Sequence, residues 1–187
     1  GYPRYEGGTR TMVDIVVGEV EPLRIERKGL YPSLFNIDEC WIYDTGAGRS
    51  MVTADKVSKF GKFLRPKVPL KFNTANGPVK AERCIRLELF SRNHTDKKVK
   101  ILEPYIMPSQ TPSIISAYDL SEAAGIGSIW VPGFTPALFD NEANVYPMGS
   151  WNETPKISKG ICPVPTWTQM LHDHGCYIEN NLLIIPL

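Results

Sequence analysis

The chain has 187 residues, a length that fits one domain with extensions and allows a hydrophobic core to form without disulfides. Its 21 Lys and Arg residues against 20 Asp and Glu residues give a net charge of +1, so composition offers no case for nucleic-acid or anionic-membrane binding. It has no apolar run of about 18 residues and no signal-peptide-like start, which argues against a membrane span and against secretion. The four cysteines are far apart and fit reduced thiols, so we expect an intracellular setting.

The first strand signals lie near the N-terminus. Residues 11–18 are rich in β-branched side chains and end at a glycine, and residues 22–28 alternate with a period of two. This pattern predicts an early hairpin or edge ribbon.

A short apolar run then leads into the one Asp-Thr-Gly of the chain. Residues 41–43 predict a buried strand that delivers Asp44 into a turn, where Gly46 and Gly48 can adopt backbone angles that other residues resist. Residues 52–57 are expected to form a short strand or a helical turn.

Two hairpins are predicted next. Residues 69–75 and 79–90 flank Asn76-Gly77, a pair typical of hairpin turns because Asn and Gly tolerate positive φ. The polar residues 93–98 then predict a second turn, which leads into a strand.

One short helix is predicted after an apolar pair. The run 114–125 passes from β-type residues into good helix formers and stops at Gly125. Residues 128–132 and 137–147 look like another β-pair, with Asp140-Asn141 as its turn.

The C-terminal part carries weaker signals. Residues 148–165 are punctuated by Pro and Gly and are expected to be a loop. Residues 166–175 are expected to form a capped helix and residues 181–187 a terminal strand. Many short strands with one or two helices predict a mostly β domain.

Taken in order, these features resemble retropepsin-type aspartic proteases and, more narrowly, the proteases of copia-like retrotransposon polyproteins. The matches are the apolar residues 41–43 before Asp44-Thr45-Gly46-Ala47, the hairpin 72–78, the run 111–117, and the pair of runs 128–132 and 139–146. In one position the chain departs from the family, because Ala117 stands where the family has Gly before its helix.

The resemblance implies a retropepsin-like closed β-barrel, the acid protease fold, with one or two short helices. Residues 1–34 would be an N-terminal β extension and residues 35–147 the protease domain. Residues 148–187 would be a C-terminal extension, with the option of packing on the same domain.

The resemblance also implies a chemistry. Without a metal or a covalent intermediate, amide hydrolysis needs one group to take a proton from water and another to protonate the leaving group. Two close carboxylates that share one proton can do both. Asp44 is the one strong candidate, so a homodimer would supply the second carboxylate from a second Asp44, and no cofactor or metal is expected.

The neighbouring residues would support this site. Thr45 would lock the two active-site turns together, Gly46 would permit close backbone approach, and Ala47 would complete the turn. The hairpin tip would be a flap that closes over an extended peptide or polyprotein substrate. The expected flap residues are Asn73, Thr74, Ala75, Asn76 and Gly77.

The expected function is therefore an aspartic endopeptidase that processes a retrotransposon-like polyprotein, in the cytoplasm or within a virus-like particle. The alternative is a catalytically inactive retropepsin-like binding or assembly module. A zinc module built on His172, His174 and Cys176 is a third, less favoured hypothesis, because their spacing matches no recognised ligand pair. Asp119 is expected to brace the short helix, and Cys40 to be a small buried hydrophobic residue.

Overall fold

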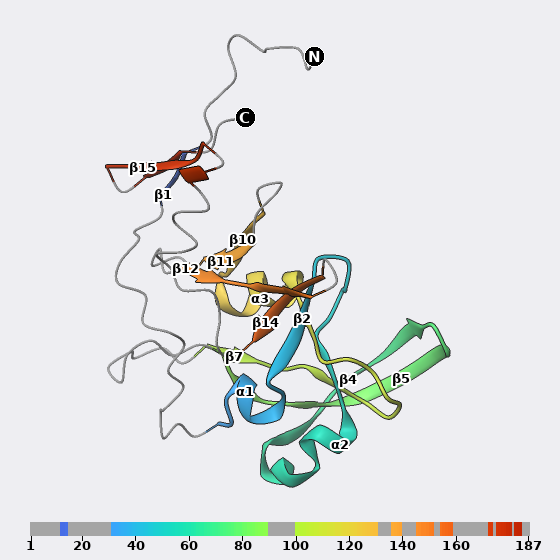
Figure 1. Ribbon diagram of the computed structural model, residues 1–187. Coiled ribbons are helices and arrows are strands. Elements are labelled where there is room, and N and C mark those ends of the chain that lie inside the picture. The colour runs from blue at the N-terminus through green and yellow to red at the C-terminus, as the bar shows by residue number, and fades with distance from the viewer. Residues whose placement is uncertain are drawn as a thin grey trace.

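The computed structural model describes residues 12–14, 31–89, 100–130, 136–139, 145–151, 154–158, 172–173, 175–180 and 182–184. These residues are mostly β, with a few short helices (Figure 1). In spatial order, the largest sheet contains β13 (Gly149–Trp151), β14 (Thr154–Ser158), β2 (Cys40–Asp44), β9 (Ile114–Ser116), β3 (Met51–Thr53), β8 (Tyr105–Met107), β5 (Gly77–Ile85) and β4 (Leu64–Thr74).

This sheet is open in the part of the chain that the structure describes. Its end strands, β13 and β4, are not hydrogen-bonded to each other, so the expected closed barrel is not seen among these strands. The hairpin of β4 and β5 forms one end of the sheet and projects from the rest of it (Figure 1).

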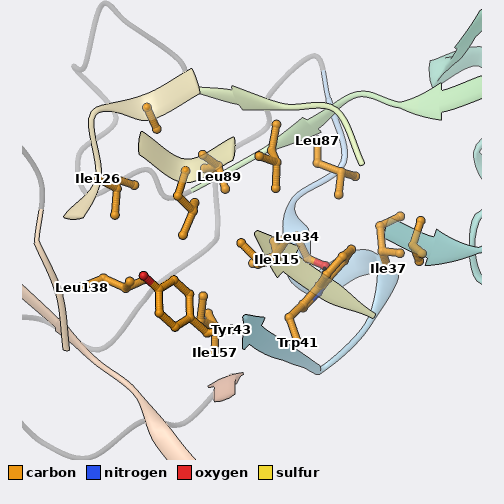
Figure 2. Packing of buried hydrophobic residues seen from close by; sticks show 14 of the residues in the cluster. Leu34, Ile37, Trp41, Tyr43, Leu87, Leu89, Ile115, Ile126, Leu138 and Ile157 are labelled. Atoms are coloured by element: carbon orange, nitrogen blue, oxygen red, sulfur yellow. Dashed lines mark hydrogen bonds between the residues drawn. The ribbon is translucent and has the colours of Figure 1, made fainter. Parts of the chain in front are cut away.

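The core is built on the strand that precedes Asp44. Because side chains alternate along a strand, β2 buries both Trp41 and Tyr43. The indole Nε1 of Trp41 donates to the backbone oxygens of Leu34 and Asp38, at 3.1 and 3.2 Å. Figure 2 shows Trp41 and Tyr43 among other apolar side chains of this cluster, which the neighbouring strands extend with Ile115 of β9 and Ile157 of β14.

Several predicted elements are confirmed. The run 41–43 lies in β2, and residues 52–57 form both of the expected alternatives, since β3 is followed directly by α2 (Ala54–Val57). The projecting hairpin is confirmed as β4 and β5. β6 (Leu87–Glu88) pairs antiparallel with β7 (Ile101–Leu102), as the second hairpin requires, although its turn at 93–98 lies outside the described residues.

The predicted helix is also confirmed. β9 leads directly into α3 (Ala117–Ala124), which ends at Gly125 in the left-handed conformation with φ of 60°. The Gly125 N–H donates to the oxygen of Ser121 at 2.9 Å, and the Ile126 N–H donates to the oxygen of Leu120 at 3.2 Å. These bonds satisfy carbonyl groups at the end of the helix.

The prediction of a loop over residues 148–165 is wrong for its first part. β13 and β14 form an antiparallel pair there, and β14 pairs with β2. Ile157 is 1% exposed within the main core, so tertiary burial outweighs the local Pro and Gly signals. Part of the C-terminal segment therefore shares a sheet with Asp44.

Two elements between the N-terminus and the hairpin were not predicted. They are α1 (Leu34–Ile37) and a 3-10 helix (Ser58–Phe63). The side-chain oxygen of Asn36 accepts hydrogen bonds from the N–H and hydroxyl of Ser33, at 2.8 and 2.9 Å. This pairing of Ser33 with Asn36 is a helix-start signal that the sequence carries.

Two smaller sheets complete the described fold. β10 (Gly127–Ile129), β11 (Ala137–Phe139) and β12 (Val145–Pro147) form one of them, which confirms the predicted β-pair, whereas its expected Asp140-Asn141 turn lies outside the described residues. In the other sheet, β16 (Leu182–Ile184) pairs with both β1 (Met12–Asp14) and β15 (Tyr177–Glu179). β16 therefore lies between β1 and β15 in this sheet (Figure 1).

The described partner of the first strand is therefore the C-terminal strand, not residues 22–28, which lie outside the described residues. Most of the helix expected at 166–175 also lies outside them. None of the described helices has the length and apolar character that crossing a bilayer requires.

Candidate active site

Asp44 lies where three strands of the large sheet meet. It is the last residue of β2 and pairs in parallel register with Ser116, the last residue of β9. β9 lies between β2 and β3, which the loop 45–50 connects. The loop must therefore cross the end of β9, at the point where α3 begins.

The carboxylate of Asp44 is held by its own turn. Its Oδ1 accepts hydrogen bonds from the N–H groups of Gly46 at 2.7 Å and Ala47 at 3.1 Å. This arrangement is typical of Asp side chains in turns. A Cβ on residue 46 would lie 3.4 Å from Oδ1, at the short end of ordinary van der Waals contact.

The tip of this loop is open to solvent. Thr45, Gly46 and Gly48 are exposed, whereas Asp44 and Ala47 are half-buried. In the single chain Thr45 is therefore accessible from outside. A surface of this kind is available for contact with another molecule or a second copy.

Polar groups under the loop fix its later part. The Ser116 hydroxyl donates to the backbone oxygen of Ala47 at 2.6 Å, and the Ser116 N–H donates to the hydroxyl of Ser50 at 3.0 Å. Ser50 and Ser116 are both fully buried. These contacts join the loop to the end of β9.

Asp119 in the first turn of α3 adds a charged contact. Its Oδ2 accepts from the Ser50 N–H at 2.5 Å, and its Oδ1 lies 3.8 Å from a guanidinium nitrogen of Arg49. The Asp119 N–H donates to the Ser116 hydroxyl at 3.3 Å, so Ser116 caps the helix. Asp119 thus binds the loop that follows Asp44 as well as the helix start it was expected to brace.

Ala117, the position that departs from the family, is accommodated next to this network. It is half-buried and packs against the main hydrophobic cluster. The presence of the Ala117 methyl group does not disrupt the turn, because Asp44 Oδ1 still accepts both hydrogen bonds, from the Gly46 and Ala47 N–H groups.

The predicted flap residues form the tip of the projecting hairpin. Thr74 and Gly77 are paired across it, so its two turn residues are Ala75 and Asn76, one position earlier than Asn76-Gly77. Gly77 has φ of +103° and takes the backbone conformation that glycine favours, whereas Asn76 does not have a positive φ. The Thr74 hydroxyl accepts from the Asn76 N–H at 3.2 Å and donates to the Gly77 oxygen at 2.7 Å.

Exposure differs along the tip. Asn73, Ala75 and Asn76 are exposed, and Thr74 and Gly77 are half-buried. The hydrogen bonds given above join residues of the hairpin to one another. None of the described hydrogen bonds joins the tip to the Asp44 turn.

A small hydrophobic cluster connects the part of the hairpin next to its tip to the strand that leaves the Asp44 loop. Phe72 and Val79 of the hairpin and Met51 of β3 pack around Ala81, Tyr105 and Met107. The rings of Phe72 and Tyr105 meet edge to face at 5.4 Å, and the Tyr105 hydroxyl donates to the oxygen of Val68 at 2.9 Å. This outer part of the hairpin and β3 therefore pack on the same cluster.

A hollow of about 510 Å³ is lined in part by Asp119 and does not include Asp44. Its polar wall is partly self-neutralised, because Arg86 Nε lies 2.7 Å from Glu103 Oε1. The carboxylates that line the hollow do not share it with Asp44, so the hollow does not supply the second carboxylate. Its lining residues are Tyr31, Lys67, Arg86, Ile101, Leu102, Glu103, Asp119, Glu122 and Ala123.

The described residues hold no group of three or more His, Cys, Asp and Glu side chains that could bind a metal. His172 is exposed and Cys176 is buried, and His174 lies outside the described residues. Cys40, Cys84 and Cys176 are free thiols, and burial raises the pKa of Cys84 and of Cys176. Cys40 is only half-buried at the start of β2, less enclosed than expected.

Comparison with models of known protein families finds no match. Searches among curated proteins and among solved structures also find none.

Proposed function

We propose that this chain is one half of a homodimeric aspartic endopeptidase, with Asp44 as its catalytic residue. The observation that carries the proposal is the Asp44 turn itself. One carboxylate oxygen is fixed by the Gly46 and Ala47 N–H groups, at the end of a buried strand, beneath a solvent-exposed loop tip. The Asp-Thr-Gly-Ala sequence and its ordered partners in the resemblance support this assignment.

In the proposed dimer, a two-fold axis passes between two Asp44 side chains. Two carboxyl groups about 3 Å apart cannot both be ionised, because their negative charges repel. The pair therefore shares one proton and titrates as a unit. The ionised carboxylate takes a proton from water, which attacks the peptide carbonyl carbon. The protonated partner gives its proton to the carbonyl oxygen, so that a tetrahedral gem-diol forms. The first carboxyl group then gives the proton that it took from water to the leaving amine, and a gem-diol hydroxyl returns a proton to the partner as the C–N bond breaks.

The remaining residues have supporting roles in this proposal. Thr45 is exposed, as a side chain that bonds a second copy of the turn must be. The tip from Asn73 to Gly77 acts as a flap that binds an extended peptide through backbone hydrogen bonds and excludes water. The substrate class is a polyprotein of a retrotransposon-like element. A retropepsin-like barrel is part of the same proposal.

We also propose an intracellular setting, either the cytoplasm or the interior of a virus-like particle. The free thiols of Cys40, Cys84 and Cys176 fit a reducing compartment.

Replacement of the catalytic carboxylate tests the proposal. Asp44→Asn keeps the size of the side chain and can still accept from Gly46, but it cannot act as a base. Cleavage of a peptide library at acidic to neutral pH is expected to fall by roughly 1,000-fold or more. Mass spectrometry of the products measures this loss.

Asp55→Asn is the matched control, because Asp55 is exposed on α2 and bonds Gln110. It is expected to cleave like the parent chain. Absence of cleavage by the parent under every condition would refute the enzyme and favour the second candidate, a retropepsin-like binding or assembly module. For that module, the exposed apolar side chains Val68, Tyr118 and Trp130 would be available as contacts with a partner.

A further inference from the structure

The loop that follows Asp44 is held by polar groups that have no part in the proposed proton transfers. They come from the end of β9, the start of α3 and the loop itself. Ser50, Ser116 and Asp119 make up this set, which we call the loop clamp.

The two serines of the clamp are interior residues. Each is 0% exposed, and they are joined by the hydrogen bond from the Ser116 N–H to the Ser50 hydroxyl. Removal of a buried partner leaves the other group unsatisfied, which costs more than the bond itself contributes. A buried polar pair of this kind therefore fixes one arrangement of the backbone around it.

Asp119 connects this pair to the helix. Its carboxylate accepts from the Ser50 N–H, and its own N–H donates to the Ser116 hydroxyl. Arg49 is a weaker partner, because its guanidinium lies 3.8 Å from the carboxylate and 4.8 Å from the ring centroid of Tyr118. These bonds therefore connect the N-terminus of α3 to the last residues of the loop.

One residue links the clamp to the catalytic carboxylate. Ala47 donates its N–H to Asp44 Oδ1 and accepts the Ser116 hydroxyl at its backbone oxygen. A change at the Ser116 hydroxyl thus reaches the carboxylate through Ala47, in addition to the strand pairing of Ser116 with Asp44. In a pair of carboxylates about 3 Å apart, a displacement of roughly 1 Å is enough to reduce the rate by about 100-fold.

We propose that the loop clamp positions Asp44, so that Ser50, Ser116 and Asp119 control the geometry of the half-site without touching substrate. This inference rests on the proposed protease function and extends it to the residues that regulate the same site.

Ser116→Ala and Asp119→Ala test the clamp, with Ser113→Ala as the matched control. Ser113 is also a buried serine just before β9, but its hydroxyl donates to Asp38 and it lies outside the clamp. Residue-resolved amide exchange in the full-length chain is the first measurement. The clamp variants are expected to raise exchange at the Gly46, Ala47 and Ser50 amides by about fivefold or more, and the control by less than about twofold.

Equal exchange at these amides in clamp and control variants would overturn the clamp, whether or not the chain is a protease. Asp119→Ala removes a partly exposed side chain, so its amide exchange can be measured even if Ser116→Ala does not fold. The exchange result therefore separates failure of the clamp from failure of the proposed function.

Peptide cleavage is the second measurement, made at equal folded fraction. The clamp variants are expected to lower kcat by about 10- to 100-fold with KM within about twofold, whereas Ser113→Ala keeps the parent kcat. A fall in kcat of the same size in Ser113→Ala, or an unchanged kcat in both clamp variants, would overturn the positioning role.

Discussion

The carboxylate of Asp38 joins three segments of the chain close to the start of β2. It accepts from the ammonium group of Lys56 and from the Ser113 hydroxyl, the latter at 2.6 Å. Burial by itself raises the pKa of Asp38, but the bonds from Lys56 and Ser113, the charge of Lys56 and the Cys40 N–H outweigh it. The pKa of Asp38 is therefore held below its usual value.

The sign of this shift fixes its effect on stability. A lowered pKa means that the folded state favours the ionised carboxylate. The contribution is fully present above the unfolded value of 3.8 and is lost as pH falls through the lower folded value.

Asp38→Asn should therefore lower the free energy of unfolding by about 1 kcal/mol at neutral pH, because Lys56 and Ser113 lose a charged acceptor. The difference from the parent should shrink as pH falls below 3.8. Urea unfolding across this pH range measures both. Glu39→Gln, an exposed neighbouring change, serves as the control, and a pH-independent difference would contradict the assignment.

Among the elements, α3 has both of its ends determined locally. Ser116 caps its start, and Gly125 ends it in the left-handed conformation. The helix in turn carries Asp119, which contacts the Asp44 loop. The correct termination of this short helix therefore bears on the site.

Gly125→Ala should destabilise the protein by about 1 kcal/mol, because a side chain is strained at positive φ. Gly61→Ala is the matched control. A Cβ on either glycine would meet no atom within 4 Å, and of the two only Gly125 has a positive φ. Thermal unfolding should separate the variants, and equal losses would show that φ is not the cause.

At the level of the whole molecule, one chain supplies one Asp-Thr-Gly turn. The described part of the chain brings no second carboxylate into hydrogen-bonding contact with Asp44. Its Thr45 and Gly46 remain exposed at the loop tip. These properties are consistent with the proposed half-site, which would require a second copy.

Activity should consequently depend on chain concentration, because dissociation separates the two carboxylates. Specific activity is expected to fall on dilution in step with the mass of the particle in solution. Asp44→Asn added to the parent should inhibit it by forming mixed dimers, whereas added Asp55→Asn should not. A chain that stays monomeric at high concentration would refute the mechanism.

The predictions that proved correct are those in which a few neighbouring residues determine the backbone conformation. Gly125 ends α3, and the apolar run before Asp44 forms a buried strand. The observed hairpin turn lies one residue earlier than the predicted Asn76-Gly77 turn, and Gly77 rather than Asn76 has the positive φ. α1 was missed although Ser33 and Asn36 carry a helix-start pattern.

The sequence by itself determined the mostly β character, the turn at Asp44 and the helix that follows β9, because each depends on local propensity and periodicity. Only the tertiary structure decided that β9 lies between β2 and β3, that β14 joins β2, and that β1 pairs with β16. These pairings depend on burial and on hydrogen bonds between residues far apart in the chain. The contacts of Ser116 and Asp119 with the loop arise in the same way, since no local pattern specifies which distant backbone groups a side chain will meet.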